Sequence, residues 1–205
     1  MVTGAYFPEL SGAGLQCRSL TKVLKESADF LVFTTTTRPT LPEAEEIDGV
    51  PVFRVPVNPS RFASKLAGLW RFTMLFATHR QRFSIVHLHG FSQKSILCMA
   101  LAAVFRKAVV IKLTGVNFDD PIAIRRRGRW TYWWYSRAAL FIGVSPQFQL
   151  LYDQAGLPRQ RFTMIPNGVD VTRFRPGRSG ECEVTRRRFG LPTTGSVVLF
   201  VGFFS

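Results

Sequence analysis

The chain has 205 residues, of which 46% are hydrophobic and 13% aromatic, so it can bury a large apolar core without the help of disulfides or a structural metal ion. Its three cysteines are odd in number and lack CxxC spacing, which argues against a disulfide framework and a zinc site and indicates a reducing compartment. Lys and Arg outnumber Asp and Glu by 27 to 13, a balance that attracts nucleic acid, nucleotide phosphates or an anionic membrane surface.

The N-terminal residues carry no basic segment followed by an apolar run, so no secretory signal is visible. The longest apolar stretch, residues 66–77, is interrupted by Arg71 and is too short to span a bilayer. We therefore expect a cytoplasmic protein. Peripheral association with the inner face of the membrane is compatible with this location.

Short β-rich runs alternate with longer helical patterns, which is typical of a parallel sheet flanked by helices. The expected strands are Asp29–Thr35, Val52–Val57, Ser84–His89, Ala108–Leu113, Leu140–Val144 and Arg161–Ile165. The expected helices are Gly14–Glu26, Ser60–Arg82, Gln93–Phe105, Gly128–Ala138 and Pro146–Ala155. Right-handed crossovers then predict the fold class: α/β, with a Rossmann-like, doubly wound parallel sheet.

Both ends of the sequence look clipped. Only Val2 and Thr3 remain of an expected first strand, and the buried-strand run Ser196–Gly202 stops almost at once. Because a lone strand cannot form a domain, we expect a second α/β unit to begin near Ser196 and to be missing. The expected organisation is a domain at residues 1–174, a connector at 175–195, and the first strand of a truncated domain at 196–205.

The first candidate motif is Gly12-Ala13-Gly14, which leads directly into a helical pattern. Glycines let the backbone approach a phosphate closely, and the amides at a helix N-terminus direct partial positive charge toward it. The motif lacks the full dinucleotide fingerprint, so a plain tight turn is an equal interpretation.

Two further motifs follow expected strands. One expected strand ends in His87, His89 and Gly90, at the edge where parallel sheets bind ligands. We interpret His87 as a packing residue, whereas His89 is equally well interpreted as a packing residue or as a catalyst. The run Lys112–Pro121 covers the end of the next strand and the loop after it, and its carboxylates either bind sugar hydroxyls or form an Asx-type turn that Pro121 stops.

The run Met164–Pro176 combines a strand end, a Pro-Asn-Gly turn and a Pro-bounded connector. It resembles the segment that leaves the first domain in family 4 retaining glycosyltransferases of the GT-B fold. Four other motifs occur in the family's order. Tyr6–Gly14 resembles the first loop, which lies against the donor diphosphate, and Ile85–Gly90 resembles the strand ending in His-x-His-Gly. Val144-Ser145 resembles the end of the sixth strand, and Val198–Gly202 the opening strand of the nucleotide-sugar domain.

The resemblance implies an enzyme that moves a sugar from a nucleotide-diphosphate donor to an acceptor hydroxyl with retention, in cell-envelope or polysaccharide synthesis, without a metal or other cofactor. It assigns catalysis to His89 and Thr114, donor binding to Gly12, Ala13, Gly14 and Asn167, and acceptor binding to Gly90, Gly115, Asp119 and Asp120. Thr114 stands where the family commonly has a histidine, and a threonine cannot carry charge. The family's donor-binding lysine and paired glutamates belong to the second domain, so this chain alone is expected to be inactive.

Two stretches, Arg61–Arg82 and Arg125–Trp134, mix arginine with aromatic residues. This mixture suits an anionic membrane interface or single-stranded nucleic acid, and it also fits an ordinary helix with a solvated charged face. The resemblance favours a membrane surface and a sugar or lipid-linked acceptor, with no nucleic-acid partner. Two rivals stay open: a non-catalytic basic Rossmann-like domain that binds nucleotide or nucleic acid, and a nucleotide-sugar epimerase.

Overall fold

A computed structural model of the protein describes residues 1–178 and 180–200. The chain divides into two compact units, the first unit Met1–Asn167 and the second unit Gly168–Ser205. The division falls seven residues before the expected domain end at residue 174, and the expected three-part organisation stays a prediction. None of the described helices is long and apolar enough to cross a membrane.

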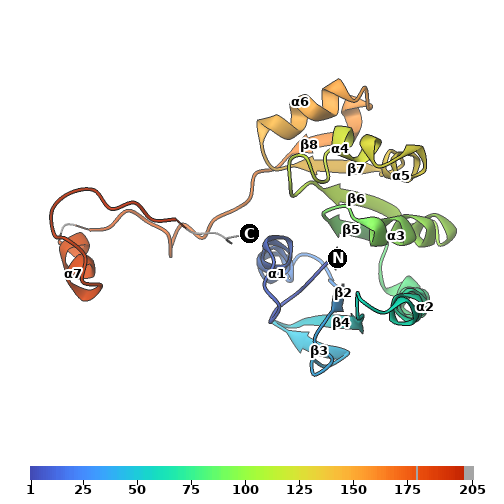
Figure 1. Ribbon diagram of the computed structural model, residues 1–205, viewed down its shortest axis with the longest axis horizontal. Helices are drawn as coiled ribbons and strands as arrows, with labels where there is room; N and C mark the ends of the chain where they lie inside the picture. Colours follow the sequence, from blue (N-terminus) through green and yellow to red (C-terminus); the bar gives the residue numbers. More distant parts are fainter. Residues whose placement is uncertain (179, 201–205) are drawn as a thin grey trace. The chain divides into compact units, whose positions relative to one another are not determined.

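Among the described residues, eight strands form one sheet in the order β3-β4-β2-β1-β5-β6-β7-β8 (Figure 1). The strands are β1 (Val2–Thr3), β2 (Val32–Thr36), β3 (Ala44–Ile47), β4 (Val50–Pro56), β5 (Ile85–His89), β6 (Ala108–Lys112), β7 (Leu140–Gly143) and β8 (Phe162–Met164). All neighbouring strands are parallel except β3 and β4. The predicted doubly wound α/β fold is confirmed.

Six helices of the first unit connect these strands: α1 (Gly12–Leu24), α2 (Phe62–His79), α3 (Gln93–Val104), α4 (Pro121–Arg126), α5 (Arg129–Tyr135) and α6 (Pro146–Gln154). Single 3-10 turns follow at Arg80–Arg82 and Arg159–Arg161. Helices α2 to α6 share one hydrophobic cluster, whereas α1 contributes Cys17 to a second cluster with β2 and β4. The sheet therefore has a five-helix face and an α1 face.

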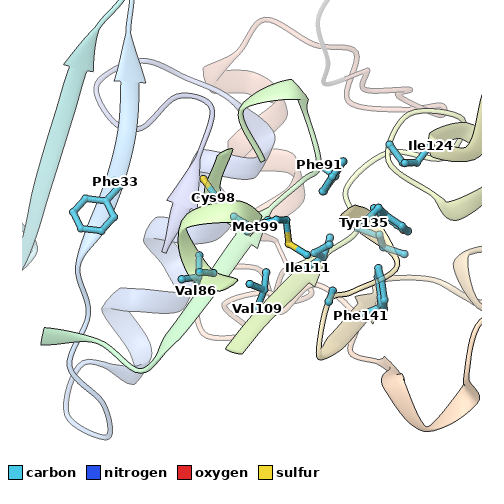
Figure 2. Packing of buried hydrophobic residues seen from close by; sticks show 14 of the residues in the cluster. Phe33, Val86, Phe91, Cys98, Met99, Val109, Ile111, Ile124, Tyr135 and Phe141 are labelled. Atoms are coloured by element: carbon cyan, nitrogen blue, oxygen red, sulfur yellow. The ribbon is translucent and has the colours of Figure 1, made fainter. Parts of the chain in front are cut away.

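The core of the five-helix face is built by alternate residues of β5 and β6. In Figure 2, Cys98 and Met99 of α3 lie among Val86 of β5 and Val109 and Ile111 of β6, and all five are at most 6% exposed. Burying a side chain of this size stabilises the fold by about 1.5–3 kcal/mol. Because side chains alternate along a strand, the residues between these must face α1.

Strand β3 was not expected from the sequence. It pairs antiparallel with β4 through a tight turn at Asp48 and Gly49, whose φ angles of 54° and 81° are left-handed. The residues of β3, Ala-Glu-Glu-Ile, include none that is buried and show no apolar alternation. The Asp-Gly dipeptide between the two strands is the sequence signal that could have revealed the hairpin.

Two short helices were also not expected. Pro121 does not stop a turn but occupies the first position of α4, where its missing amide costs nothing. In the second unit, residues 175–195 include α7 (Glu181–Arg188), which begins where Glu181 forms an ion pair with Arg175 at 3.1 Å. Residues 196–200 have no regular secondary structure, and the rest of the expected strand at 196–202 lies outside the described residues.

Close packing at the end of β7 requires a glycine at position 143. A Cβ atom there would lie 2.5 Å from the ring of Phe162 and 3.0 Å from Phe148, both of which pack in or against the core. We predict that Gly143→Ala lowers the free energy of unfolding by about 1–3 kcal/mol, measured by urea denaturation. Gly168→Ala is the control, because no atom lies within 4 Å of a Cβ at that position. Equal stability of the two variants would contradict this account.

Candidate functional site

The order of strands reverses direction between β1 and β5. From β1 the chain proceeds through α1 to β2 on one side, whereas β5, β6, β7 and β8 follow one another on the other side. The loops that leave β1 and β5 therefore diverge and leave a crevice at the carboxyl ends of these strands, which is where open α/β sheets bind ligands. The loop at residues 4–11 and Gly90 flank this position.

The loop after β1 ends at the N-terminus of α1. Ser11 caps the helix, with its Oγ accepting a hydrogen bond from the amide of Gly14 at 3.0 Å. Among the described residues, the amides of Gly12 and Ala13 have no acceptor, and such amides carry the partial positive charge of the helix end. Binding of a donor phosphate at these amides stays a prediction.

The two glycines of this motif differ in their surroundings. A Cβ at Gly14 would lie 2.3 Å from the carbonyl oxygen of Ala5, so this residue must be glycine for α1 to pack on the loop. A Cβ at Gly12 would meet no atom within 4 Å. Gly14 thus holds the helix in place, whereas Gly12 leaves open space in front of the amides.

Arg54 of β4, which the sequence analysis gives no role, anchors the same loop. Its side chain is fully buried, donates to the carbonyl of Phe7 at 2.7 Å and to that of Pro42 at 3.1 Å, and pairs with Glu45. An arginine at an inward position of an otherwise apolar strand was the available signal, because a buried charge requires partners.

His87 and His89 lie on the α1 face of β5 with their rings 4.5 Å apart. His89 is 5% exposed, and neither of its ring nitrogens has a hydrogen-bond partner among the described residues. Burial, and after it repulsion by His87, lowers the pKa of His89 well below its usual value, and burial lowers that of His87 to about 4. Both imidazoles are therefore neutral at pH 7, with unused nitrogens.

Lys112 lies beside His89 in the parallel register of β5 and β6. The residue is buried, its ammonium donates to Oε1 of Gln16 on α1 at 3.2 Å, and burial lowers its pKa. An ammonium has three donors, so donors remain for an anionic ligand. The sequence analysis gives Lys112 no role, although a lysine that ends an apolar strand at the ligand edge was a usable signal.

Asp119 organises the loop after β6. Its buried carboxylate accepts hydrogen bonds from the amide of Thr114 at 2.9 Å, from the Thr114 hydroxyl at 2.7 Å and from the amide of Gly115 at 2.9 Å. Burial nevertheless raises the pKa of this carboxyl. Gly90, with φ of 85°, approaches the same group so closely that a Cβ would lie 3.1 Å from Oγ1 of Thr114. The fold thus brings four predicted site residues together.

Asp120 has a structural position. Its carboxylate caps α4 by accepting from the amide of Ala123 at 2.9 Å, and it accepts from the amide of Asn117 at 2.6 Å. Asp119 and Asp120 are both buried and hydrogen-bonded, whereas the side chains of Thr114, Asn117 and Phe118 in the same loop are exposed. Direct contact between either carboxylate and an acceptor stays a prediction.

Asn167 is the last residue of the first unit and is exposed. No side-chain hydrogen bond is formed by Asn167 within the described part of the chain. Its role in donor binding stays a prediction. The described residues also contain no group of three or more His, Cys, Asp or Glu side chains arranged to hold a metal ion.

The buried imidazoles make stability depend on pH. An unfolded histidine has a pKa near 6.5, whereas folded His87 has one of about 4, so the unfolded chain binds the proton first as pH falls. Stability is present above pH 6.5 and is lost toward pH 4. From His87 alone we expect a loss of about 2 kcal/mol between pH 7 and pH 5, measured by urea denaturation. His87→Gln should reduce this pH dependence, and an unchanged dependence would contradict the account.

The glycine pair of α1 provides a second test. We predict that Gly14→Ala destabilises the fold by about 1–3 kcal/mol, because the new methyl group collides with backbone. Gly12→Ala should leave stability unchanged or raise it slightly, because alanine favours helix over glycine. Thermal unfolding followed by circular dichroism measures both changes, and a large loss of stability in Gly12→Ala would refute the proposed difference.

Comparisons with solved structures show the same architecture at low sequence identity. The crystal structure of Anabaena Alr3699/HepE in complex with UDP superposes with a TM-score of 0.62 and 17% identity, covering 92% of this chain and 49% of that one. Sucrose-phosphate synthase from Thermosynechococcus elongatus superposes with a TM-score of 0.63 and 16% identity, covering 93% of this chain and 52% of the other. The chain thus spans about half the length of these two structures.

A curated relative matches over a shorter segment. The D-inositol 3-phosphate glycosyltransferase of Acidothermus cellulolyticus is 48% identical over 52 residues, which are 25% of this chain and 11% of that protein. The model of the glycosyl transferase 4-like domain matches residues 11–168, which include α1, the whole of β2 to β8 and all the candidate residues of the crevice. The chain belongs to the glycosyl transferase 4-like family.

Proposed function

We propose that this chain is the acceptor-side domain of a retaining glycosyltransferase, which moves a sugar from a nucleotide-diphosphate donor to an acceptor hydroxyl in cell-envelope or polysaccharide glycoconjugate synthesis. The observation that carries the proposal is His89, a neutral imidazole that is 5% exposed and has two unused nitrogens where the strand order reverses. Family membership supports it, and one neighbouring structure contains UDP.

The donor diphosphate would lie at the N-terminus of α1. The amides of Gly12 and Ala13 have no acceptor among the described residues, and Gly12 leaves room for close approach. Lys112 adds a partly buried ammonium linked to the same helix through Gln16. Amides and an ammonium that are fixed before the reaction stabilise the charge that develops on the leaving diphosphate. Asn167 would add a contact from the end of the first unit.

The acceptor would lie over the loop that Asp119 organises. The Thr114 hydroxyl donates to Asp119, so its lone pairs remain to accept from a sugar hydroxyl. Thr114 carries no charge and therefore positions the acceptor instead of transferring a proton. A neutral His89 can accept a hydrogen bond at pH 7. Gly90 and Gly115 have no side chains that would project toward the acceptor. Asp119 and Asp120 act through the shape of the loop.

This function needs a nucleotide-sugar donor, a sugar or lipid-linked acceptor and no metal or other cofactor. Cytoplasmic location at the inner face of the membrane would give access to both substrates. No nucleic-acid partner is required, and the chain's basic charge suits phosphates and anionic lipids.

Nucleotide titration tests the site directly. We predict that UDP, added to the isotope-labelled chain, shifts the amide resonances of Gly12 and Ala13 and the imidazole resonances of His89. Lys112→Gln should weaken this binding about tenfold, because a partly buried charged contact contributes on the order of 1.5–3 kcal/mol. Lys22→Gln is the matched control, since Lys22 lies exposed at the other end of α1.

The outcomes separate the proposal from its main rival. Shifts confined to the crevice and sensitive to Lys112 would support a donor site. Shifts spread over basic surfaces, equal in both variants and reproduced by an oligonucleotide with steep salt dependence, would instead indicate a non-catalytic nucleic-acid-binding domain.

A further inference from the structure

The outward face of α2 carries a row of apolar side chains that no part of the first unit covers. Phe62, Leu66, Trp70 and Met74 follow one another at four-residue intervals and are between 40% and 80% exposed. The opposite face of the helix packs into the core through Phe72 and Phe76. We call these four exposed side chains the α2 stripe. A row this long differs from the scattered apolar residues of an ordinary surface.

The charges around the α2 stripe have one sign. Residues 60–82 contain no Asp or Glu, and their basic residues are Arg61, Lys65, Arg71, Arg80 and Arg82. One acidic side chain reaches this helix from outside, because Arg71 forms an exposed ion pair with Glu43 at 3.0 Å. The surface is therefore apolar along its centre and cationic along its margins.

A second aromatic group lies on the same face of the sheet. Trp130 and Trp133 of α5 are exposed and stack with ring centroids 5.4 Å apart, and Arg137 covers the ring of Trp133. Helix α3 packs against both α2 and α5, so these two helices lie on either side of α3 (Figure 1). Trp134, by contrast, packs against the core and is not available to a partner.

We propose that the α2 stripe inserts into the interface of an anionic membrane leaflet, with Trp130 and Trp133 as a second contact. An amphipathic helix with arginine and lysine beside a Trp/Phe/Leu face has the composition of helices that lie in such an interface. Basic side chains on the margins would meet lipid phosphates, and the apolar centre would enter the acyl boundary. This inference goes beyond sugar transfer and does not depend on it.

The same charges disfavour a second copy of the chain as the partner. Two copies joined through the α2 stripe would bring their basic margins together, whereas an anionic leaflet neutralises them. Nucleic acid would meet the basic margins but would leave the aliphatic side chains of Leu66 and Met74 without a suitable contact, because bases stack on aromatic rings.

Vesicle co-sedimentation tests the proposal with the whole chain. We expect the protein to bind vesicles of equal parts phosphatidylglycerol and phosphatidylcholine, and to bind pure phosphatidylcholine vesicles far more weakly. The double variant Leu66→Ser, Trp70→Ser should weaken binding to anionic vesicles about tenfold or more. The double variant Val23→Ser, Leu24→Ser is the matched control, because it removes two exposed apolar side chains from α1 on the other face.

Circular dichroism and thermal unfolding of both double variants establish that they are folded, and all four substituted side chains are exposed, so we expect wild-type stability. Stripe and control variants that bind anionic vesicles equally well would overturn the proposal. So would equal binding to neutral and anionic vesicles, or a stripe-dependent dimer detected by size-exclusion chromatography. Loss of vesicle binding in the stripe variant, with UDP-induced shifts retained, would support it independently of the transfer reaction.

Discussion

The alternation of side chains along β5 is the constraint on which the rest of the structure depends. Val86 and Leu88 enter the core beneath the five-helix face, so His87 and His89 must face α1. A shift of one residue would exchange the two pairs, placing imidazoles in the core and aliphatic groups at the crevice. The apolar packing of one face therefore fixes the polar chemistry of the other, and it holds His89 where burial keeps it neutral and without partners.

The crevice combines groups that are preorganised by different means. Helix α1 is set by its capping serine and by the close approach at Gly14, the loop after β6 is closed around the carboxylate of Asp119, and Arg54 secures the loop after β1. These residues support the loops and the helix and are not themselves proposed to contact a ligand. The groups to which we assign ligand contacts are amides, one hydroxyl, one ammonium and an imidazole, which together suit phosphate and sugar hydroxyls.

The strand and helix pattern of the sequence predicted the parallel sheet, and the order of its motifs predicted the family. Periodicity was sufficient there because buried parallel strands are continuous apolar runs. It failed for β3, a four-residue edge strand with two glutamates and no buried residue, and for α4, whose six residues are too few to show a helical period. The sequence signals a buried charge at Arg54 but not its partners, which are distant backbone groups, and the partners of Asp119 come close only after the loop has folded.

The central claim is that a nucleotide diphosphate binds at the end of α1, beside Lys112 and His89. A crystal structure of the chain with UDP tests it most directly. The account predicts phosphate density within hydrogen-bond distance of the amides of Gly12 and Ala13 and of the Lys112 ammonium. Phosphate density on the exposed arginines of α4 and α5, with the crevice unchanged, would contradict it.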